Sequence, residues 1–184
     1  NLKRYVIKQW MWNVQAVAHN ATNLSHPLMP IFYGVQGAGK SRLTNWLLKP
    51  LLDMHQETDL GQYLDDKNTD LKSNNLVFNI PEMAGHNRSE IEKLKSNMDS
   101  GYKSSRIMYS QSSQTTYYRA QLIGTSNTDV SEVIRDTTGN RRFFQFKVGR
   151  GQQYRINYDQ FDPQRFWNSI KYNDEQPFEN IDIH

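Results

Sequence analysis

The stretch YGVQGAGKSRL, residues 33–43, contains the pattern G-x-x-x-x-G-K-S from Gly34 to Ser41. A loop that binds phosphate must bring backbone N–H groups close to its ligand, and glycine is needed wherever a side chain would block that approach. Lys40 can reach the β- and γ-phosphates of a nucleotide, and the Ser41 hydroxyl can ligate Mg²⁺. The stretch therefore predicts a nucleotide-binding loop rather than a glycine-rich turn that happens to precede Lys-Ser.

The sequence on both sides of this stretch fits a strand–loop–helix unit. An apolar run from Leu28 to Tyr33 precedes the loop and is typical of a buried strand, despite Pro30. A helical pattern from Ser41 to Lys49 follows the loop and is disturbed by Pro50. The residues expected to surround a bound nucleotide are Gly34, Gln36, Gly37, Ala38, Gly39, Lys40, Ser41 and Arg42.

The composition is that of one polar, folded domain. The chain has 184 residues, of which 36% are hydrophobic and 12% aromatic, so a core can form. There is no cysteine, and the histidines show no metal-ligand spacing. No apolar run approaches the ~18 residues of a membrane span, and we expect a cytoplasmic protein. Because the chain begins at Asn1, we expect residues 1–184 to be a single domain excised from a longer protein.

Hydrophobic periodicity predicts strands that alternate with helices. Helices are expected over Leu2–His19 and Ser41–Lys49, from the S-x-x-E capping box of Ser89 and Glu92 to about Met98, and from Asp162-Pro163 onward. Strands are expected at Leu28–Tyr33, Leu76–Ile80, Arg106–Ser110, Thr115–Tyr118 (running on into Ala120–Gly124) and Arg141–Val148. This alternation predicts an α/β fold with a mostly parallel central sheet and one inserted β-hairpin, joined by QSSQ at residues 111–114.

The first predicted helix carries two tryptophans. Trp10 and Trp12 lie two positions apart, so on a helix they face different sides. One of them is therefore expected to meet another domain or subunit.

Two polar side chains follow later apolar strands. In LVFNIPEMAG, Glu82 comes just past a strand, where a carboxylate can hold Mg²⁺ and orient water. In AQLIGTSN, an apolar strand ends in Asn127, whose amide can bond the γ-phosphate or the attacking water. Each residue alone also fits a solvated loop or a turn. Their order after the phosphate loop favours a hydrolytic site.

Two adjacent arginines precede the last predicted strand, in DTTGNRRFFQF. An arginine is the residue expected to neutralise charge on a transferring phosphoryl group, often across a subunit boundary. On a strand, Arg142 shares the more apolar face, so Arg141 is the freer candidate for such an arginine finger. The alternative is a pair of surface arginines.

Taken together, these motifs resemble the ATPase domain of virulence-associated protein E, a family of phage and mobile-element proteins related to superfamily 3 helicases within the AAA+ class. The run D-x-T-G-N-R-R-F is the most specific piece. The matching segments span nearly the whole chain in the family's order, and they are GVQGAGKS, IPEMAGHNRSEIEKLKS, LIGTSNTDVSEVIRDTTGNRRFF and DPQRFWNSI.

The resemblance implies a three-layer P-loop NTPase domain that hydrolyses ATP with Mg²⁺ and assembles as a homo-oligomeric ring, expected to be a hexamer. It implies a helicase that translocates on single-stranded DNA during replication of a phage or mobile element, with a primase-like domain as a further expectation. By motif it assigns Lys40 and Ser41 to the binding of ATP and Mg²⁺. The catalytic acidic role, with a share in Mg²⁺, falls to Glu82, the sensor role to Asn127, and the finger to Arg141 or Arg142.

The chain departs from the family's pattern in two segments. The family commonly has an acidic residue on the second strand where this chain has Asn79, which leaves Glu82 as the only carboxylate there. The family often has an Arg-Pro-Pro-Tyr run after the lysine-rich helix, where this chain reads GYKSSRIMYS. The first departure bears on how Mg²⁺ is held.

The predicted hairpin is the candidate DNA-binding element. In superfamily 3 helicases, a hairpin between the acidic strand and the sensor strand grips single-stranded DNA in the ring channel, and Arg106 to Tyr118 lies in that interval. Basic groups that track phosphates, with aromatic groups that stack on bases, are the expected chemistry. The candidates are Lys103, Arg106 and Arg119, with Ser112 and Ser113 at the uncharged tip. The alternative is a hairpin whose tyrosines pack on the sheet.

Two other functions fit the same loop. A small-molecule kinase would need a lid rich in arginines, and the chain offers only dispersed arginines between Arg135 and Arg155. A non-hydrolysing ATP-binding module would serve as a DNA-binding or assembly platform, and Asn79 in place of a carboxylate is the feature that favours it.

Overall fold

The computed structural model describes residues 2–21, 24, 27–65, 74–100, 102–106, 113–117, 119–134, 141–150, 157–158 and 160–177, with the backbone alone for 100, 102–106 and 113–117. The helices are α1 (Leu2–Ala18), α2 (Lys40–Leu48), α3 (Leu60–Leu64), α5 (Arg88–Ser100), α6 (Ser131–Ile134) and α7 (Pro163–Asn168), with 3₁₀ turns η1 (Lys49–Leu51) and η2 (Met83–Gly85). The strands are β1 (Met29–Tyr33), β2 (His55–Glu57), β3 (Val77–Ile80), β4 (Tyr102–Arg106), β5 (Ser113–Tyr117), β6 (Gln121–Ser126) and β7 (Phe143–Lys147).

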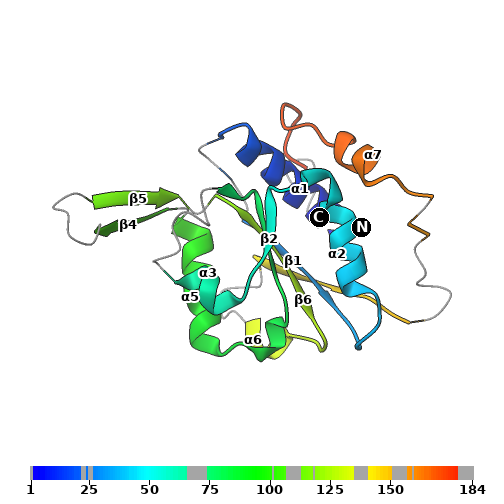
Figure 1. The fold of residues 1–184 in the computed structure, drawn as a ribbon, viewed down its shortest axis with the longest axis horizontal. Coiled ribbons are helices and arrows are strands. Elements are labelled where there is room, and N and C mark those ends of the chain that lie inside the picture. The colour runs from blue at the N-terminus through cyan, green and yellow to red at the C-terminus, as the bar shows by residue number, and fades with distance from the viewer. Residues whose placement is uncertain are drawn as a thin grey trace.

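The centre of the molecule is a five-stranded sheet in the order β2-β3-β6-β1-β7, and every pairing in it is parallel. Parallel strands need crossover connections, so the carboxyl ends of all five strands meet at one edge of the sheet. The predicted mostly parallel α/β sheet is confirmed. The inserted hairpin is a separate two-stranded antiparallel sheet, β4-β5, which projects from the body beyond α5 (Figure 1).

Helices cover both faces of the sheet and complete three layers. One core cluster joins buried side chains of α3, α5 and α6 to the sheet through residues such as Tyr63, Ile91 and Ile134. The other joins α1, α2, η1 and the end of α7 to the opposite face (Figure 1). No helix in the described parts of the chain is long and apolar enough to cross a membrane.

Strand β1 lies inside the sheet, between β6 and β7, although it contains Pro30. The amide of Met29 donates to the carbonyl of Arg142 on the β7 side at 2.7 Å, whereas pairing with β6 begins only at Ile31. The nitrogen of Pro30 faces β6 and has no hydrogen to donate, so one bond of that ladder is missing. The carbonyl of Leu122 on β6 accepts from the Trp10 indole instead.

Helix α1 is buried more completely than its amphipathic pattern predicts. Trp10 is fully buried, donates from its indole to the carbonyl of Leu122 at 2.8 Å and packs on Trp167. Trp12 is also buried, and its indole donates to the carbonyl of Asp174 at 3.2 Å. The expectation that one of these rings faces another domain was wrong, because the segment after α7 covers the outer side of α1.

Two local predictions were shifted along the chain. The capping box of α5 is formed by Asn87 and Glu90, each amide donating to the other's side chain at 3.0 Å, and not by Ser89 and Glu92. The first strand of the hairpin includes Tyr102–Arg106, earlier than the predicted start at Arg106, and Arg106 pairs with Ser113. The rest of the predicted strand Arg106–Ser110 and the first two residues of the QSSQ turn lie outside the described residues. Strand β6 belongs to the central sheet rather than continuing β5.

Candidate functional site

The glycine-rich loop leaves the carboxyl end of β1 between two neighbouring strands. The amide of Gly34 donates to the carbonyl of Ser126 on β6 at 3.1 Å, and the amide of Val148 after β7 donates to Tyr33 at 2.7 Å. A β-carbon at Gly34 would overlap the Val148 carbonyl oxygen, so only glycine fits there. The start of the loop is thus fixed on both sides.

Helix α2 begins at Lys40, directly after the loop. Gly39 has a left-handed backbone with φ 91° and offers no side-chain cap, so the first-turn amides of α2 face the mouth of the loop without a capping partner. Such amides, with the positive end of the helix dipole, favour a phosphate. The loop residues Gln36 and Gly37 and the helix residue Ser41 are exposed, while Ala38 and Gly39 are half-buried.

Lys40, Asn127 and Glu82 form one hydrogen-bonded chain. The buried ammonium of Lys40 donates to the carbonyls of Gly34 at 2.7 Å and Val35 at 3.2 Å, and to Asn127 Oδ1 at 2.9 Å. Asn127 Nδ2 in turn donates to Glu82 Oε1 at 2.6 Å. Three side chains predicted from separate segments therefore meet at the carboxyl edge of the sheet.

The turn that carries Asn127 is fixed by hydrogen bonds. The carboxylate of Asp129 accepts from the amide of Ser131 at 2.8 Å and from Gln145 Nε2 on β7 at 3.2 Å. Hydrogen bonds from the Ser131 hydroxyl, then from its amide and more weakly from Gln145, lower the pKa of Asp129 below its usual range. The turn after β6 is thereby tied to β7 as well as to the phosphate loop.

Glu82 has a left-handed backbone, with φ 50° and ψ 46°, just before η2. A non-glycine residue in this region costs on the order of 1 kcal/mol, and such strain is common at functional sites. The conformation directs the exposed Glu82 carboxylate toward Asn127 rather than along the line of β3. No group of three or more histidine, aspartate or glutamate side chains that could hold a metal ion occurs among the residues described.

Asn79 does not lie at the catalytic edge. It pairs with Ile123 on β6, one position before the Gly124 that faces Ile31 of β1, so Asn79 is level with Pro30. Four residues separate that level from Gly34, which is about 13 Å along the strand. The buried amide donates instead to Glu57 Oε2 on β2 at 3.0 Å. The interpretation of Asn79 as a substitute for a magnesium ligand is not supported by this position.

The two arginines before β7 have different environments. Arg142 is buried and forms a two-pronged ion pair with Asp99 of α5, Nε to Oδ1 at 2.7 Å and Nη2 to Oδ2 at 2.5 Å. Arg141 is exposed and has no ion pair within the described part of the chain. Arg142 therefore ties β7 to α5, and Arg141 is the arginine left available for a partner.

Removing the partner of Arg142 is expected to destabilise the fold. Asp99→Asn leaves the buried guanidinium without its counter-charge, and we expect a loss of about 2 kcal/mol in the free energy of unfolding, because Asp99 is only partly buried. Urea unfolding measures the loss. Arg4→Ala, which removes an exposed arginine from α1, should change it by less than about 0.5 kcal/mol. Equal midpoints for the two variants would contradict a structural role for the pair.

Arg42, also predicted to surround the nucleotide, lies beside an aromatic cluster. Its guanidinium stacks 4.6 Å above the ring of Tyr158, which also contacts Trp46 of α2. Burial raises the pKa of the Tyr158 hydroxyl, and the nearby charge of Arg42 opposes that rise. The exposed Arg42 side chain is in the first turn of α2, and the Tyr158 ring beside it is half-buried.

The predicted DNA-binding residues lie away from the phosphate loop. Lys103 and Arg106 belong to β4 and Ser113 to β5, whereas Ser112 lies outside the described residues. Arg119 is half-buried between the hairpin and β6. Because the hairpin leads into the amino end of β6, it emerges at the edge of the sheet opposite the loop (Figure 1).

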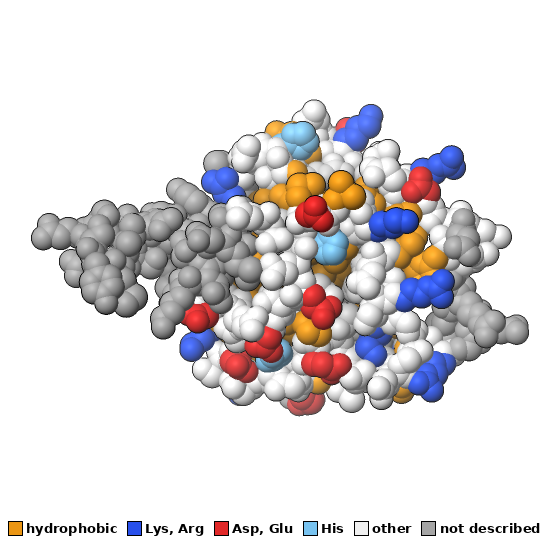
Figure 2. All heavy atoms as spheres, viewed as in Figure 1, with side chains coloured by type: hydrophobic (Ala, Val, Ile, Leu, Met, Phe, Trp, Pro, Cys, Tyr) orange, Lys and Arg blue, Asp and Glu red, His pale blue; other side chains and the backbone are white. Residues whose placement is uncertain are grey.

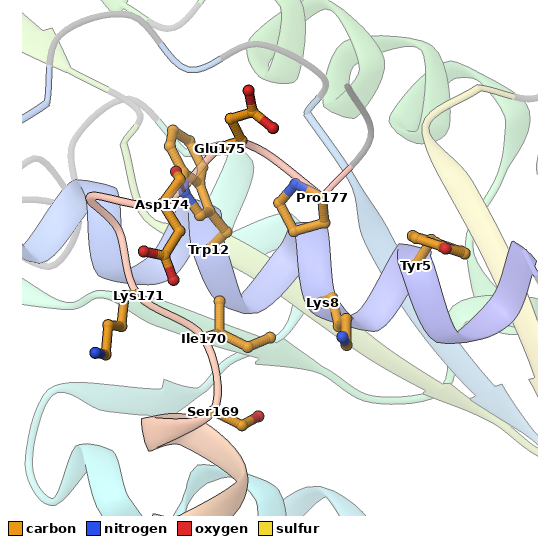
Figure 3. A pocket seen from close by; sticks show the side chains of 9 residues that line it. All are labelled: Tyr5, Lys8, Trp12, Ser169, Ile170, Lys171, Asp174, Glu175 and Pro177. Carbon is orange, nitrogen blue, oxygen red and sulfur yellow. Dashed lines mark hydrogen bonds between the residues drawn. The ribbon is translucent and has the colours of Figure 1, made fainter. Parts of the chain in front are cut away.

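A pocket of about 280 Å³ lies between α1 and the segment after α7. Figure 3 shows Trp12 and Ile170 at its apolar part, with Lys8, Lys171 and Asp174 around it. Its lining contains no residue of the phosphate loop or of the Lys40 network. Its mixed charges single out no ligand class.

The strand order, with a glycine-rich loop between interior strand β1 and helix α2, defines a P-loop NTPase core. The chain belongs to the family of virulence-associated protein E-like domains, whose model matches residues 1–176. Membership implies a nucleotide-binding NTPase domain. No curated protein sequence matches the chain.

Several solved structures share the fold. Three apo structures of the NrS-1 C-terminal region align with TM-scores of 0.52, 0.52 and 0.54 at 16–17% sequence identity. The alignments cover 90–95% of this chain and 41–45% of the NrS-1 chains, so the chain spans less than half of their length. At this identity the likeness concerns the fold.

Sequence reasoning missed two residues of this region. Asp99 gives no local signal, because its partner Arg142 is distant in the sequence. Arg150 was counted only among the dispersed arginines, yet its guanidinium donates to the carbonyl of Gln36 in the phosphate loop. Its position just after the strand next to β1 was the available signal.

Proposed function

We propose that the chain is the ATP-hydrolysing motor domain of a DNA helicase or translocase that acts in replication of a phage or mobile genetic element. The observation that carries the proposal is the meeting of Lys40, Asn127 and Glu82 at the carboxyl edge of the sheet, beside the phosphate loop. A binding loop alone needs only the lysine. A carboxylate and an amide beside it supply what hydrolysis requires.

In this proposal the three side chains act on the phosphates and on the attacking water. Lys40 exchanges its loop carbonyls for the β- and γ-phosphates of ATP, and Asn127 bonds the γ-phosphate or the attacking water. Glu82 orients that water and takes its proton as the P–O bond to ADP breaks, releasing phosphate. The Ser41 hydroxyl and the Glu82 carboxylate are the groups that would hold Mg²⁺, which would neutralise charge on the phosphate oxygens.

The position of Arg141 favours a ring, which we propose is a homohexamer. Phe143 pairs with Met29, so Arg141 precedes that level by two residues and Gly34 follows it by five. Seven residues correspond to about 20 Å along the sheet, which is beyond the reach of a side chain. Arg141 can therefore serve only a nucleotide held by another copy of the chain.

The hairpin is the proposed contact for single-stranded DNA. It projects from the body, and it follows the acidic strand and precedes the sensor strand (Figure 1). In the view of Figure 2, Asp and Glu side chains gather where α5 and α6 lie. Their negative charge would repel the phosphates of DNA from that part of the surface. Lys103, Arg106 and Arg119 bring positive charge to the hairpin and its base.

Removing the two hairpin cations should reduce the salt dependence of DNA binding. Each phosphate contact to a single strand contributes about 0.7 to the slope of log K against log salt, so Lys103→Ala with Arg106→Ala is expected to lower the slope by about 1.4. Fluorescence anisotropy with an oligothymidylate over a salt series measures it.

A matched control is Lys3→Ala with Arg4→Ala, which removes the same two charges from exposed positions of α1. The slope of this control should stay close to that of the unchanged protein. Equal slopes for the two double variants would contradict a DNA contact at the hairpin.

A further inference from the structure

Arg150 is the one arginine whose guanidinium lies against the phosphate loop within the described part of the chain. It donates to the carbonyl of Gln36, and a β-carbon at Gly37 would lie 2.9 Å from Nη2 and 3.7 Å from Cζ. Both Arg150 and Gly37 are exposed, so the group sits at the mouth of the loop. Gly37, with φ 74°, therefore also makes room for a cation.

The chemistry of that cation suits a phosphate. A guanidinium has five N–H donors, and only the Gln36 carbonyl engages this one among the described residues. Guanidinium and phosphate form paired, charge-assisted hydrogen bonds that are stronger than those between neutral groups. A polyphosphate held by the loop amides brings its oxygens beside Gly37, within reach of the remaining donors.

We propose that Arg150 binds the phosphates of the nucleotide held by its own chain. The inference rests on the proposed function. It implies that the arginines before and after strand β7 contact nucleotides held by different chains. Arg141 precedes the strand at the edge away from the loop, whereas Arg150 follows it beside the loop. The two arginines that flank β7 would therefore serve different nucleotides. Arg141 would contact the nucleotide of a neighbouring chain, and Arg150 the nucleotide of its own chain.

Arg150 contacts the phosphates and not the base, so its effect depends on the number of phosphates. ATP presents the most negative group and should lose most when the cation is removed, ADP less, and AMP almost nothing. A lysine at this position keeps a charge but loses the two-pronged geometry. Arg150→Lys is therefore expected between Arg150→Ala and the unchanged protein.

Titration calorimetry with ATP, ADP and AMP tests the contact, using the full chain with Mg²⁺. Arg150→Ala is expected to weaken ATP binding about tenfold or more and ADP binding less, and Arg4→Ala should bind like the unchanged protein. Unchanged ATP affinity in Arg150→Ala overturns the inference alone, provided that Lys40→Ala loses binding. If the unchanged protein binds no ATP, the proposed function fails as well.

A mixing experiment separates own-chain from neighbour action. Chains with Lys40→Ala cannot hold ATP but still offer their arginines to a neighbour. Mixed with Arg141→Ala chains, they should restore turnover, because the missing finger is supplied across the boundary. Mixed with Arg150→Ala chains, they should restore none. Equal rescue of both variants would show that Arg150 acts across subunits and would overturn the inference.

Discussion

Lys40→Ala is expected to lower ATP turnover by about a thousandfold or more. Among the described residues, Lys40 is the side chain that bonds both the loop carbonyls of Gly34 and Val35 and the side-chain oxygen of Asn127. Its loss removes the positive charge from the β- and γ-phosphates and also one of the two side-chain hydrogen bonds that position Asn127. Removing one preorganised donor to a developing negative charge already costs 10²–10³ in rate, and here a full charge is lost. Phosphate release at saturating ATP measures the effect.

The control for this prediction is Lys49→Ala, which removes an exposed lysine just past the end of the same helix. Its turnover should stay within about twofold of the unchanged protein. Lys40 is buried, so urea unfolding of both variants is needed to show that the fold persists. A folded Lys40→Ala chain that turns over ATP at the normal rate would contradict the assignment of the loop.

Arg141→Ala is expected to lower ATP turnover by about a hundredfold or more while leaving ATP affinity unchanged. An arginine finger stabilises only the charge that develops during phosphoryl transfer, and fingers supplied by a partner contribute 10³–10⁵ in rate. The side chain is exposed and remote from its own loop, so neither folding nor ground-state binding depends on it. Turnover and calorimetric affinity, measured on the same preparation, separate the two effects.

Arg142→Ala gives the contrasting result that makes this prediction specific. Its guanidinium is committed to Asp99, so its removal should lower the free energy of unfolding rather than act on the rate alone. If Arg142→Ala is stable and inactive while Arg141→Ala is fully active, the assignment of the finger is reversed.

The features that depend on short stretches of sequence could be predicted from the sequence alone. The phosphate loop, the α/β alternation and the start of α7 at Asp162 follow from short-range patterns, and Asp162 does accept a hydrogen bond from the Gln164 amide at 2.9 Å. Glu82 and Asn127 could be related to the loop because parallel strands present their carboxyl ends at one edge. The finer roles of these residues stay predictions.

The features that could not be predicted from the sequence depend on strand register and on contacts between residues far apart in the chain. Asn79 was interpreted as a missing carboxylate because the family commonly has an acidic residue at that strand position. Only the pairing with β6 shows how far Asn79 lies from the loop. Likewise, Arg142 and Asp99 meet through the packing of β7 against α5. The capping box moved by two residues because Asn87 competes with Ser89 for the same role.

In the proposed motor, the residues assigned to nucleotide and to DNA lie at opposite edges of the central sheet. Nucleotide chemistry gathers at the carboxyl edge with Lys40, Glu82 and Asn127, and the hairpin and Arg141 belong to the amino edge. Coupling between ATP and DNA then has to pass through the sheet, and α5 is the described element that runs from the Glu82 turn to the hairpin. In a ring, the amino edge of one chain would complete the site of the next.

The central claim is that this chain is a DNA-stimulated ATPase that works as an assembly. The most direct measurement is steady-state ATP turnover per chain, as a function of protein concentration, with and without single-stranded DNA. We predict a turnover that rises steeply with concentration as rings form and that increases further with DNA. A protein that binds ATP and assembles, yet shows no turnover with or without DNA, would contradict the account.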